Sequence, residues 1–205
     1  MNYLWPGLIA ASYFVGAVPF ALIASRRLRG IDIRRYGSGN VGATNALRTL
    51  GLGPSAVVFA CDFAKGALPT YVGWHVSGSI WVAMACGLAA VVGHSWSIYI
   101  RFGGGRGVTT SMGGLAVLLP TALLIAAAVG VLVVAATRYV SLASVLSAIV
   151  APLAAYALYR LGAPFEPTIF ALAVCILIVV RHRDNIRRLL AGTESRLGEK
   201  AGKPR

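Results

Sequence analysis

Apolar segments of nearly uniform length constrain the fold of this chain more than any other feature. They occupy about residues 4–23, 54–73, 78–97, 141–160 and 165–181, and a longer one runs from Val108 to Thr137. A helix of about 20 apolar residues spans a lipid bilayer. With 58% hydrophobic and 12% charged residues, the chain is also more apolar than soluble domains are. We therefore predict an all-α, polytopic integral membrane protein with a single domain, residues 1–205.

The count of membrane crossings depends on the longest apolar stretch, which Pro120 divides. If Pro120 separates two short helices, seven crossings place all the basic segments on one side of the membrane. The positive-inside rule assigns that side to the cytoplasm. We therefore expect seven transmembrane helices, some short or broken, with the N-terminus outside and the C-terminus cytoplasmic. The segment Val108–Leu119 would rise only about 18 Å, well short of a hydrocarbon core about 30 Å thick.

The charge of the chain is strongly positive and lies mostly outside the apolar segments. The formal net charge is +13, from 19 Lys and Arg against 6 Asp and Glu. Six arginines lie between residues 26 and 48, and eight basic residues lie between Arg181 and the end. In a soluble protein this balance would suggest nucleic acid, but the positive-inside rule explains it here. We expect a membrane lipid environment and no nucleic acid partner.

The first apolar run is predicted to stay in the mature protein as a membrane helix. No Lys or Arg precedes it and three arginines follow it, which is the reverse of a secretory signal peptide. Cys61, Cys86 and Cys175 lie within apolar stretches and have no C-x-x-C spacing, so we expect small buried side chains and no metal site. No P-loop pattern occurs, and no cofactor is predicted.

Three short polar segments interrupt the apolar sequence; the first two are rich in glycine, and the first spans residues 37–45. Glycine frees backbone amides, and a helix that begins after this segment would add partial positive charge, so the segment suits a phosphate group. An ordinary turn with Asn caps is the alternative. The candidate residues are Ser38, Gly39, Asn40, Thr44, Asn45 and Arg48.

The second polar segment repeats the glycine pattern with one fixed cation. It consists of Gly103, Gly104, Gly105, Arg106 and Gly107. Arg106 is predicted to clamp an anion, and the alternative is a flexible loop with a solvated arginine. His94, shortly before this loop, is either a packed interfacial histidine or a supporting residue of the site.

The third polar segment follows the last apolar run and contains Arg181, His182, Asn185 and Arg188. If the helix continues, the last three residues share roughly one face. Basic residues at this position also follow from the positive-inside rule, so the histidine and asparagine are the informative pair. Residues 192–205 are predicted to be a frayed polar tail with little room for function.

Asp62 and Lys65 are the only charged residues in the second apolar run. Their spacing of i, i+3 predicts an ion pair, and charge inside a membrane segment often marks a functional site. Structural pairing and a role in the site remain open alternatives.

Together the three segments resemble the motifs of the bacterial acyl-phosphate:glycerol-3-phosphate acyltransferase (PlsY) family, in order and at matching spacing over nearly the whole chain. The resemblance rests on residues 38–45 with Arg48, residues 93–110, and residues 181–189. It implies a seven-helix fold in the bacterial plasma membrane with the active site at the cytoplasmic face. It also implies that a long-chain acyl phosphate donates its acyl group to the sn-1 hydroxyl of glycerol 3-phosphate, giving lysophosphatidic acid and phosphate.

The resemblance also implies roles for individual residues. Ser38, Arg48, the glycine loop with Arg106, and His182 would hold phosphate groups. Asn40, Asn45 and Asn185 would orient substrate, and Ser38, His182 and Asn185 would form the catalytic set. The family usually has lysine where Arg106 stands and proline where Ser97 stands.

No His-x-x-x-x-Asp dyad occurs after His75, His94 or His182. Because acyl phosphate is already activated, positioning and charge stabilisation would carry much of the catalysis. We therefore hypothesise that the hydroxyl proton passes to a phosphate oxygen of the substrate, with His182 orienting. The acyl chain would enter sideways from the bilayer. The alternative is a polytopic anion or phosphate-ester transporter, which would show paired broken helices in symmetric halves, and no such repeat is visible.

Overall fold

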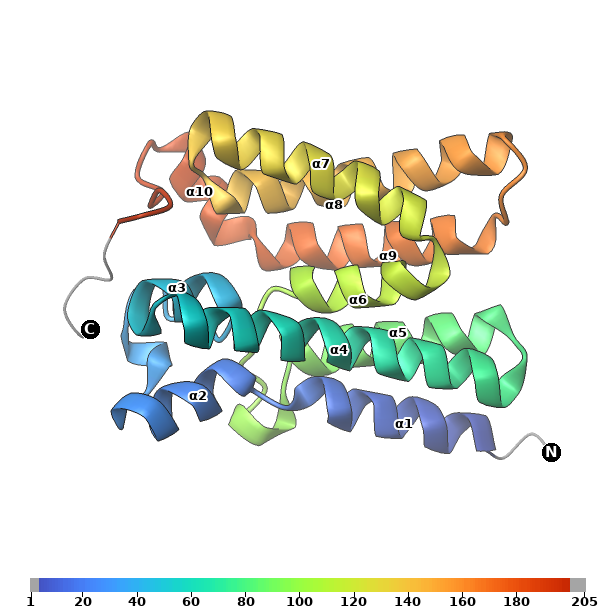
Figure 1. Cartoon of the computed structure of the whole chain (residues 1–205), viewed down its shortest axis with the longest axis horizontal. Helices are drawn as coiled ribbons and strands as arrows, with labels where there is room; N and C mark the ends of the chain where they lie inside the picture. Colours follow the sequence, from blue (N-terminus) through green and yellow to red (C-terminus); the bar gives the residue numbers. More distant parts are fainter. Residues whose placement is uncertain (1–3, 200–205) are drawn as a thin grey trace.

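The computed structural model describes residues 4–199 and folds them into a bundle of helices. Figure 1 shows α1, α4 and α5 on one side of the bundle, α7, α8 and α9 on the other, and α6 between them. The bounds are α1 (Leu4–Ala17), α2 (Phe20–Arg29), the 3-10 turn η1 (Ile33–Arg35), α3 (Ala43–Leu50), α4 (Leu52–Ser77), α5 (Ile80–Ser95), the 3-10 turn η2 (Ile98–Ile100), α6 (Val108–Leu118), α7 (Pro120–Thr137), α8 (Val140–Arg160), α9 (Glu166–Arg181) and α10 (Arg183–Leu190).

The helices confirm the all-α prediction, and three apolar runs are long enough to cross a membrane. These runs are Leu4–Arg29, Pro120–Thr137 and Val140–Arg160. The helices α5 and α6 are apolar but shorter. The expected count of seven crossings, and their direction, therefore stay predictions.

Pro120 divides the longest apolar stretch, as predicted. The helix α6 ends at Leu118, and α7 begins at Pro120, where the missing N–H costs no helical hydrogen bond. At about 1.5 Å per residue, α6 rises only about 16 Å, roughly half the thickness of the hydrocarbon core.

The first apolar run is not the single helix that we expected. The helix α1 ends at Ala17 and α2 begins at Phe20, because Pro19 cannot donate a hydrogen bond to the preceding turn. At the break, the Val18 carbonyl accepts hydrogen bonds from the Phe20 amide at 3.2 Å and from Lys65 Nζ of α4 at 2.9 Å. The bend is thus tied to the interior of the neighbouring helix.

Two reciprocal pairs of glycines allow neighbouring helices to touch through their backbones. A β-carbon on Gly66 of α4 would collide with the Thr110 carbonyl of α6, and one on Gly113 of α6 would collide with the Phe63 carbonyl of α4. Gly16 of α1 and Gly93 of α5 form the same arrangement. Small residues that allow close backbone approach are typical of helix contacts in membranes.

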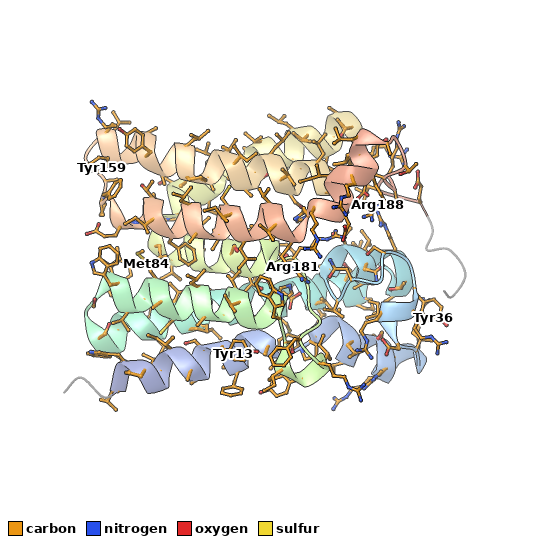
Figure 2. All side chains as sticks on the ribbon, turned by 180° about the vertical axis from the view of Figure 1, so that it is seen from behind. Tyr13, Tyr36, Met84, Tyr159, Arg181 and Arg188 are labelled. Carbon is orange, nitrogen blue, oxygen red and sulfur yellow. The ribbon has the colours of Figure 1, made fainter. Side chains whose placement is uncertain are left out.

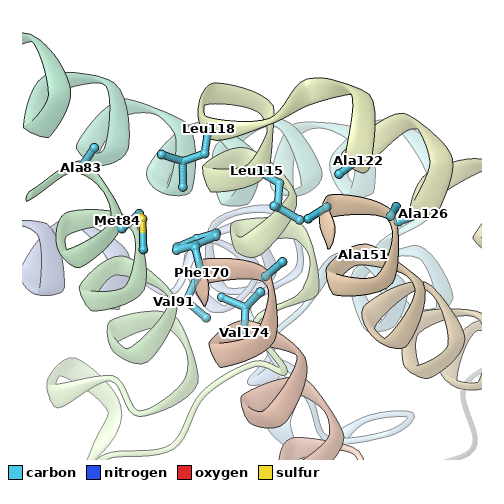
Figure 3. Packing of buried hydrophobic residues seen from close by; sticks show 13 residues of the cluster. Ala83, Met84, Val91, Leu115, Leu118, Ala122, Ala126, Ala151, Phe170 and Val174 are labelled. Carbon is cyan, nitrogen blue, oxygen red and sulfur yellow. The ribbon is translucent and has the colours of Figure 1, made fainter. Parts of the chain in front are cut away.

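The main apolar core lies where α5, α6, α7, α8 and α9 meet, around the ring of Phe170 (Figure 3). Met84 and Val91 of α5 and Leu115 of α6 belong to the same buried cluster. β-Carbons on Gly87 and Gly114 would both press against the Phe170 ring. The Phe170 ring therefore occupies space that a side chain at Gly87 or Gly114 would fill.

The polar segments gather at one end of the bundle, around α2, α3 and α10 (Figure 1). Figure 2 shows Arg188 and Tyr36 at this end and Tyr159 at the opposite end. The apolar helices thus bring residues far apart in the sequence to one polar end.

We predict that Gly66→Ala destabilises the protein by about 1–3 kcal/mol, because α4 and α6 would have to separate to admit the methyl group. Thermal unfolding in detergent measures the loss. Gly53→Ala in the same helix is the matched control, since a β-carbon there meets no atom within 4 Å. An unchanged melting temperature for Gly66→Ala would contradict the close contact.

Candidate active site

A cavity of about 480 Å³ opens at the polar end of the bundle and is lined by all three polar segments. Most of the predicted site residues face it. They are Ser38, Asn40, Thr44, Asn45, Arg48, Arg106, Gly107, His182, Asn185 and Arg188. The other four, Gly39, Gly103, Gly104 and Gly105, lie in the supporting loops.

Asn45 organises the first segment from within. Its Oδ1 accepts a hydrogen bond of 3.0 Å from the Ser38 amide, and its Nδ2 donates to the carbonyls of Tyr36 at 3.1 Å and Asn40 at 2.9 Å. The side chain is 1% exposed. Because its amide is used within the loop, Asn45 shapes the wall that presents Ser38 to the cavity. Gly39 has a φ of 72°, which favours glycine at this turn.

Two buried polar atoms of the first segment have no hydrogen-bond partner within residues 4–199. They are Oδ1 of Asn40 and Nε of Arg48. The other end of the Arg48 guanidinium donates to the Ser195 carbonyl at 3.2 Å. Buried polar groups are almost always paired in folded proteins. Unpaired atoms at the cavity wall therefore suit a polar ligand.

Hydrogen bonds hold the glycine loop from both sides, which disfavours the alternative of a flexible loop with a solvated arginine. The Gly105 amide donates to the His94 carbonyl at 2.9 Å, and a β-carbon on Gly105 would collide with the His94 ring. Arg181 donates to the carbonyls of Gly104 at 3.2 Å and Gly105 at 3.0 Å. The guanidinium of Arg181 also lies over the Trp96 ring. Figure 2 shows Arg181 where α9 ends, near the polar end of the bundle. The glycines thus position Arg106.

Ser97 anchors the start of this loop. Its amide donates to the Gly103 carbonyl at 2.8 Å, and its hydroxyl donates to the Ala17 carbonyl at 2.6 Å. Proline, which the resembling family usually has here, supplies neither donor. Ser97 therefore closes this turn by bonds particular to its own side chain and amide.

Arg106 lies among other cations in the cavity. Burial lowers the pKa of Arg106 from 12.5 to about 10, and repulsion from Arg188, Arg181 and Arg48 contributes, while Glu194 offsets part of the effect. At neutral pH the guanidinium remains charged. The cavity therefore carries an excess of positive charge that favours an anionic ligand.

His182 lies between α9 and α10, which do not form one continuous helix. Its Nδ1 is 2.8 Å from the Ile178 carbonyl, which can only accept, so Nδ1 carries the proton and Nε2 is an acceptor. Burial, together with the charge of Arg106, lowers the pKa of His182 from 6.5 to about 4. The ring is therefore neutral near pH 7. His182, Asn185 and Arg188 all line the cavity despite the break.

The tail was predicted to be frayed and to have little room for function, but Thr193, Glu194, Ser195 and Glu199 line the cavity. Glu194 accepts hydrogen bonds from Asn185 at 2.6 Å and from Arg188 at 2.7 Å. Burial acts to raise the pKa of Glu194, but these bonds outweigh it and lower the pKa. Farther along the tail, the Leu197 amide donates to the Arg138 carbonyl at 2.7 Å, and the Arg138 guanidinium donates to the Leu197 carbonyl at 2.6 Å. Residues of the segment 193–199 thus cover one side of the cavity. Residues 200–205 lie outside the described part.

Asp62 and Lys65 form the predicted ion pair, with 2.7 Å between Oδ1 and Nζ. Both side chains are buried, and Asp62 Oδ1 lies 3.7 Å from Nδ1 of His94. Asp62 and His94 also line the cavity beneath the glycine loop, so structural pairing and a place at the site occur together. Within residues 4–199, no group of three or more His, Cys, Asp or Glu is placed to hold a metal ion.

An apolar groove of about 480 Å³ adjoins the polar cavity. It runs between α6, α7, α8 and α9, and it is lined by residues such as Leu115, Ala127 and Val131. Val108, Met112, Val140 and Ser144 line both spaces. A single ligand with a charged head and an apolar tail fits this pair of spaces.

Sequence reasoning missed several residues that line the cavity, chiefly Ser141, Ser144, Thr193 and Glu194. The serines lie within an apolar helix and carried no distinctive pattern. Glu194 had one signal: it is one of few acidic residues in a strongly basic C-terminal region.

Comparison with known proteins agrees with this geometry. The family model described as glycerol-3-phosphate acyltransferase matches residues 7–192. The chain is 46% identical to glycerol-3-phosphate acyltransferase of Gloeobacter violaceus, over 96% of this chain and 98% of the relative. It is 44% identical to glycerol-3-phosphate acyltransferase 2 of Moorella thermoacetica, over 97% of this chain and 100% of the relative.

Solved structures agree in fold as well. The chain resembles the crystal structure of PlsY (YgiH), an integral membrane glycerol 3-phosphate acyltransferase, in its glycerol 3-phosphate form, with a TM-score of 0.87 and 38% identity over 95% of this chain and 96% of that one. The lysophosphatidic acid form of PlsY gives a TM-score of 0.85. This chain is therefore an integral membrane protein and belongs to the glycerol-3-phosphate acyltransferase family.

Proposed function

We propose that this protein transfers a long-chain acyl group from acyl phosphate to the sn-1 hydroxyl of glycerol 3-phosphate. The products are lysophosphatidic acid and inorganic phosphate, and the reaction begins bacterial phospholipid synthesis. One observation carries the proposal: a cavity containing Arg48, Arg106 and Arg188 opens directly into an apolar groove. Both proposed substrates carry a phosphate, and only the acyl donor needs the groove.

Arg48, Arg106 and Ser38 are the groups that we assign to the phosphates. Nε of Arg48 is buried without a partner in the described chain, and Arg106 is held in place by the glycine loop. Charge-assisted hydrogen bonds to phosphate are stronger than neutral ones. Asn185 and Arg188 already bind Glu194. We therefore propose that they hold the cavity wall in place and contact substrate atoms other than the phosphates.

The reaction needs one bond exchange and one proton transfer. The hydroxyl oxygen attacks the acyl carbonyl carbon, the bond from that carbon to the phosphate oxygen breaks, and the hydroxyl proton passes to a phosphate oxygen. With a pKa of about 4, His182 is too weak a base to hold this proton at neutral pH. Nε2 of His182 instead accepts the hydroxyl hydrogen bond and orients the attack. Arg106 stabilises the charge that develops on the departing phosphate.

The expected topology is part of the proposal. Seven crossings, with the N-terminus outside, would place the cavity at the cytoplasmic face of the bacterial plasma membrane. The concentration of arginines around the cavity supports this direction through the positive-inside rule.

We predict that Ser38→Ala and Arg48→Gln each lower the rate of lysophosphatidic acid formation by about 10- to 100-fold, because each removes a donor to phosphate. The assay uses purified protein in lipid with palmitoyl phosphate and labelled glycerol 3-phosphate, without acyl-CoA or acyl carrier protein. Arg35→Gln is the control, since Arg35 is exposed and does not line the cavity. No product from the folded parent protein would overturn the acyl-phosphate reaction and favour the transporter alternative.

We predict that Ala127→Phe narrows the groove and lowers kcat/KM for palmitoyl phosphate at least about tenfold, with a smaller effect for butyryl phosphate. Ala127 lines the groove, whereas Ala128 of the same helix is exposed on its outer surface. Ala128→Phe should therefore leave both rates near those of the parent. An equal loss for both donors would show that the groove does not hold the acyl chain.

We predict that the free energy of unfolding falls as the pH drops from 6.5 towards 4. The folded protein lowers the pKa of His182 from 6.5 to about 4, so the unfolded chain binds the proton more readily over this interval. The loss attributable to His182 is on the order of 3 kcal/mol. Thermal unfolding of the parent and His182→Gln across this interval measures it. The variant should lose less stability; parallel curves would argue against a neutral buried imidazole.

A further inference from the structure

A second cleft at the polar end shares no residue with the active-site cavity. It has a volume of about 750 Å³ and lies between the start of α2 and the turn that precedes the glycine loop. Arg26, Arg34 and Arg101 lie around it, Leu22 and Ile23 form part of its apolar side, and Tyr99 stands at its edge. This cleft of arginines and apolar side chains lies outside the three polar segments that form the active-site cavity.

The cleft carries uncompensated positive charge. Asp32 binds Arg34 through both carboxylate oxygens, at 2.9 Å and 2.6 Å, and lies 3.8 Å from Arg26. Arg101 has no ion-pair partner in the described part of the chain. One carboxylate thus contacts two of the three guanidinium groups around the cleft, and the third is left without a counter-charge. An anion with several oxygens would complete this arrangement.

The apolar side of the cleft indicates which kind of anion fits. Leu22 and Ile23 supply aliphatic surface, and the adjoining turn exposes Tyr99 by 55% and Phe102 by 61%. In membrane proteins, aromatic rings and arginines lie together at the level of the lipid headgroups. A free phosphate would gain nothing from the aliphatic wall, whereas a phospholipid would use both surfaces.

The turn that supplies Arg101 is held in an uncommon backbone conformation. Arg101 has a φ of 57° and Phe102 a φ of 59°, both in the left-handed region. This conformation costs roughly 1–2 kcal/mol per non-glycine residue. Hydrogen bonds from the Phe102 amide to the Ser97 carbonyl and from the Ser97 amide to the Gly103 carbonyl, both 2.8 Å, maintain it. The turn therefore directs a cation to the cleft and an aromatic ring to the molecular surface at a conformational cost.

We propose that this cleft binds an anionic phospholipid of the surrounding membrane. The phosphate lies between Arg26 and Arg101, and an acyl chain lies along Leu22 and Ile23. The site binds lipid as a structural ligand, separately from substrate, and its occupation does not depend on turnover at the active site.

Native mass spectrometry of the full chain, titrated with phosphatidylglycerol in detergent, tests the proposal. The double variant Arg26→Gln/Arg101→Gln should weaken the tightest lipid-binding step at least about tenfold. The control, Arg27→Gln/Arg35→Gln, removes the same charge from exposed arginines that do not line the cleft, and it should change binding less than about threefold. Phosphatidylcholine should bind the parent more weakly than phosphatidylglycerol does.

Equal weakening in the two double variants would overturn the proposal, because it would show a diffuse attraction between basic residues and lipid. Complete displacement of the lipid by millimolar inorganic phosphate would also overturn it, in favour of a free-phosphate site. The single variant Arg101→Gln keeps the Arg26–Asp32 contact and repeats the test if the double variant is unstable. Turnover with palmitoyl phosphate, measured separately, shows that each variant is folded.

Discussion

The close backbone contact between helices is the constraint on which the site depends. Glycine pairs bring α1 against α5 and α4 against α6, and Gly73 and Gly87 lie where α4 and α5 touch. Asp62 of α4 and His94 of α5 can therefore meet beneath the glycine loop. Lys65 then ties the same cluster to the Val18 carbonyl at the bend after α1. Larger residues at the crossings would spread the helices and move the floor of the cavity. The positions of the residues at the cavity floor therefore depend on glycines at the helix crossings.

Opposing charges divide the polar residues between support and ligand binding. Glu194 binds Asn185 and Arg188, and the glycine loop takes up Arg181, whereas Arg48 and Arg106 have no ion-pair partner in the described part of the chain. That arrangement favours an anion at one defined place instead of a general attraction across the basic end. By binding Arg188, Glu194 leaves Arg48 and Arg106 as the arginines of the cavity that are open to an anion.

The sequence predicted those features that depend on local chemistry. Pro120 was predicted to divide its apolar stretch and does so, and the spacing of Asp62 and Lys65 predicted their ion pair. The use of Asn45 inside its own loop, and the return of the tail to place Glu194 at the cavity, depend on contacts between distant segments. The break at Pro19 was predictable in principle, but continuous hydrophobicity on both sides obscured it.

The shared border between the polar cavity and the apolar groove has an energetic consequence for the proposed donor. The two spaces share four lining residues, Val108, Met112, Val140 and Ser144. The phosphate of the donor can therefore lie in the polar cavity while its acyl chain stays in the apolar groove. Exposing a sixteen-carbon chain to water would cost about 12 kcal/mol, at about 0.8 kcal/mol for each methylene. The shared border avoids this barrier, because the acyl chain stays in apolar surroundings from binding to product release.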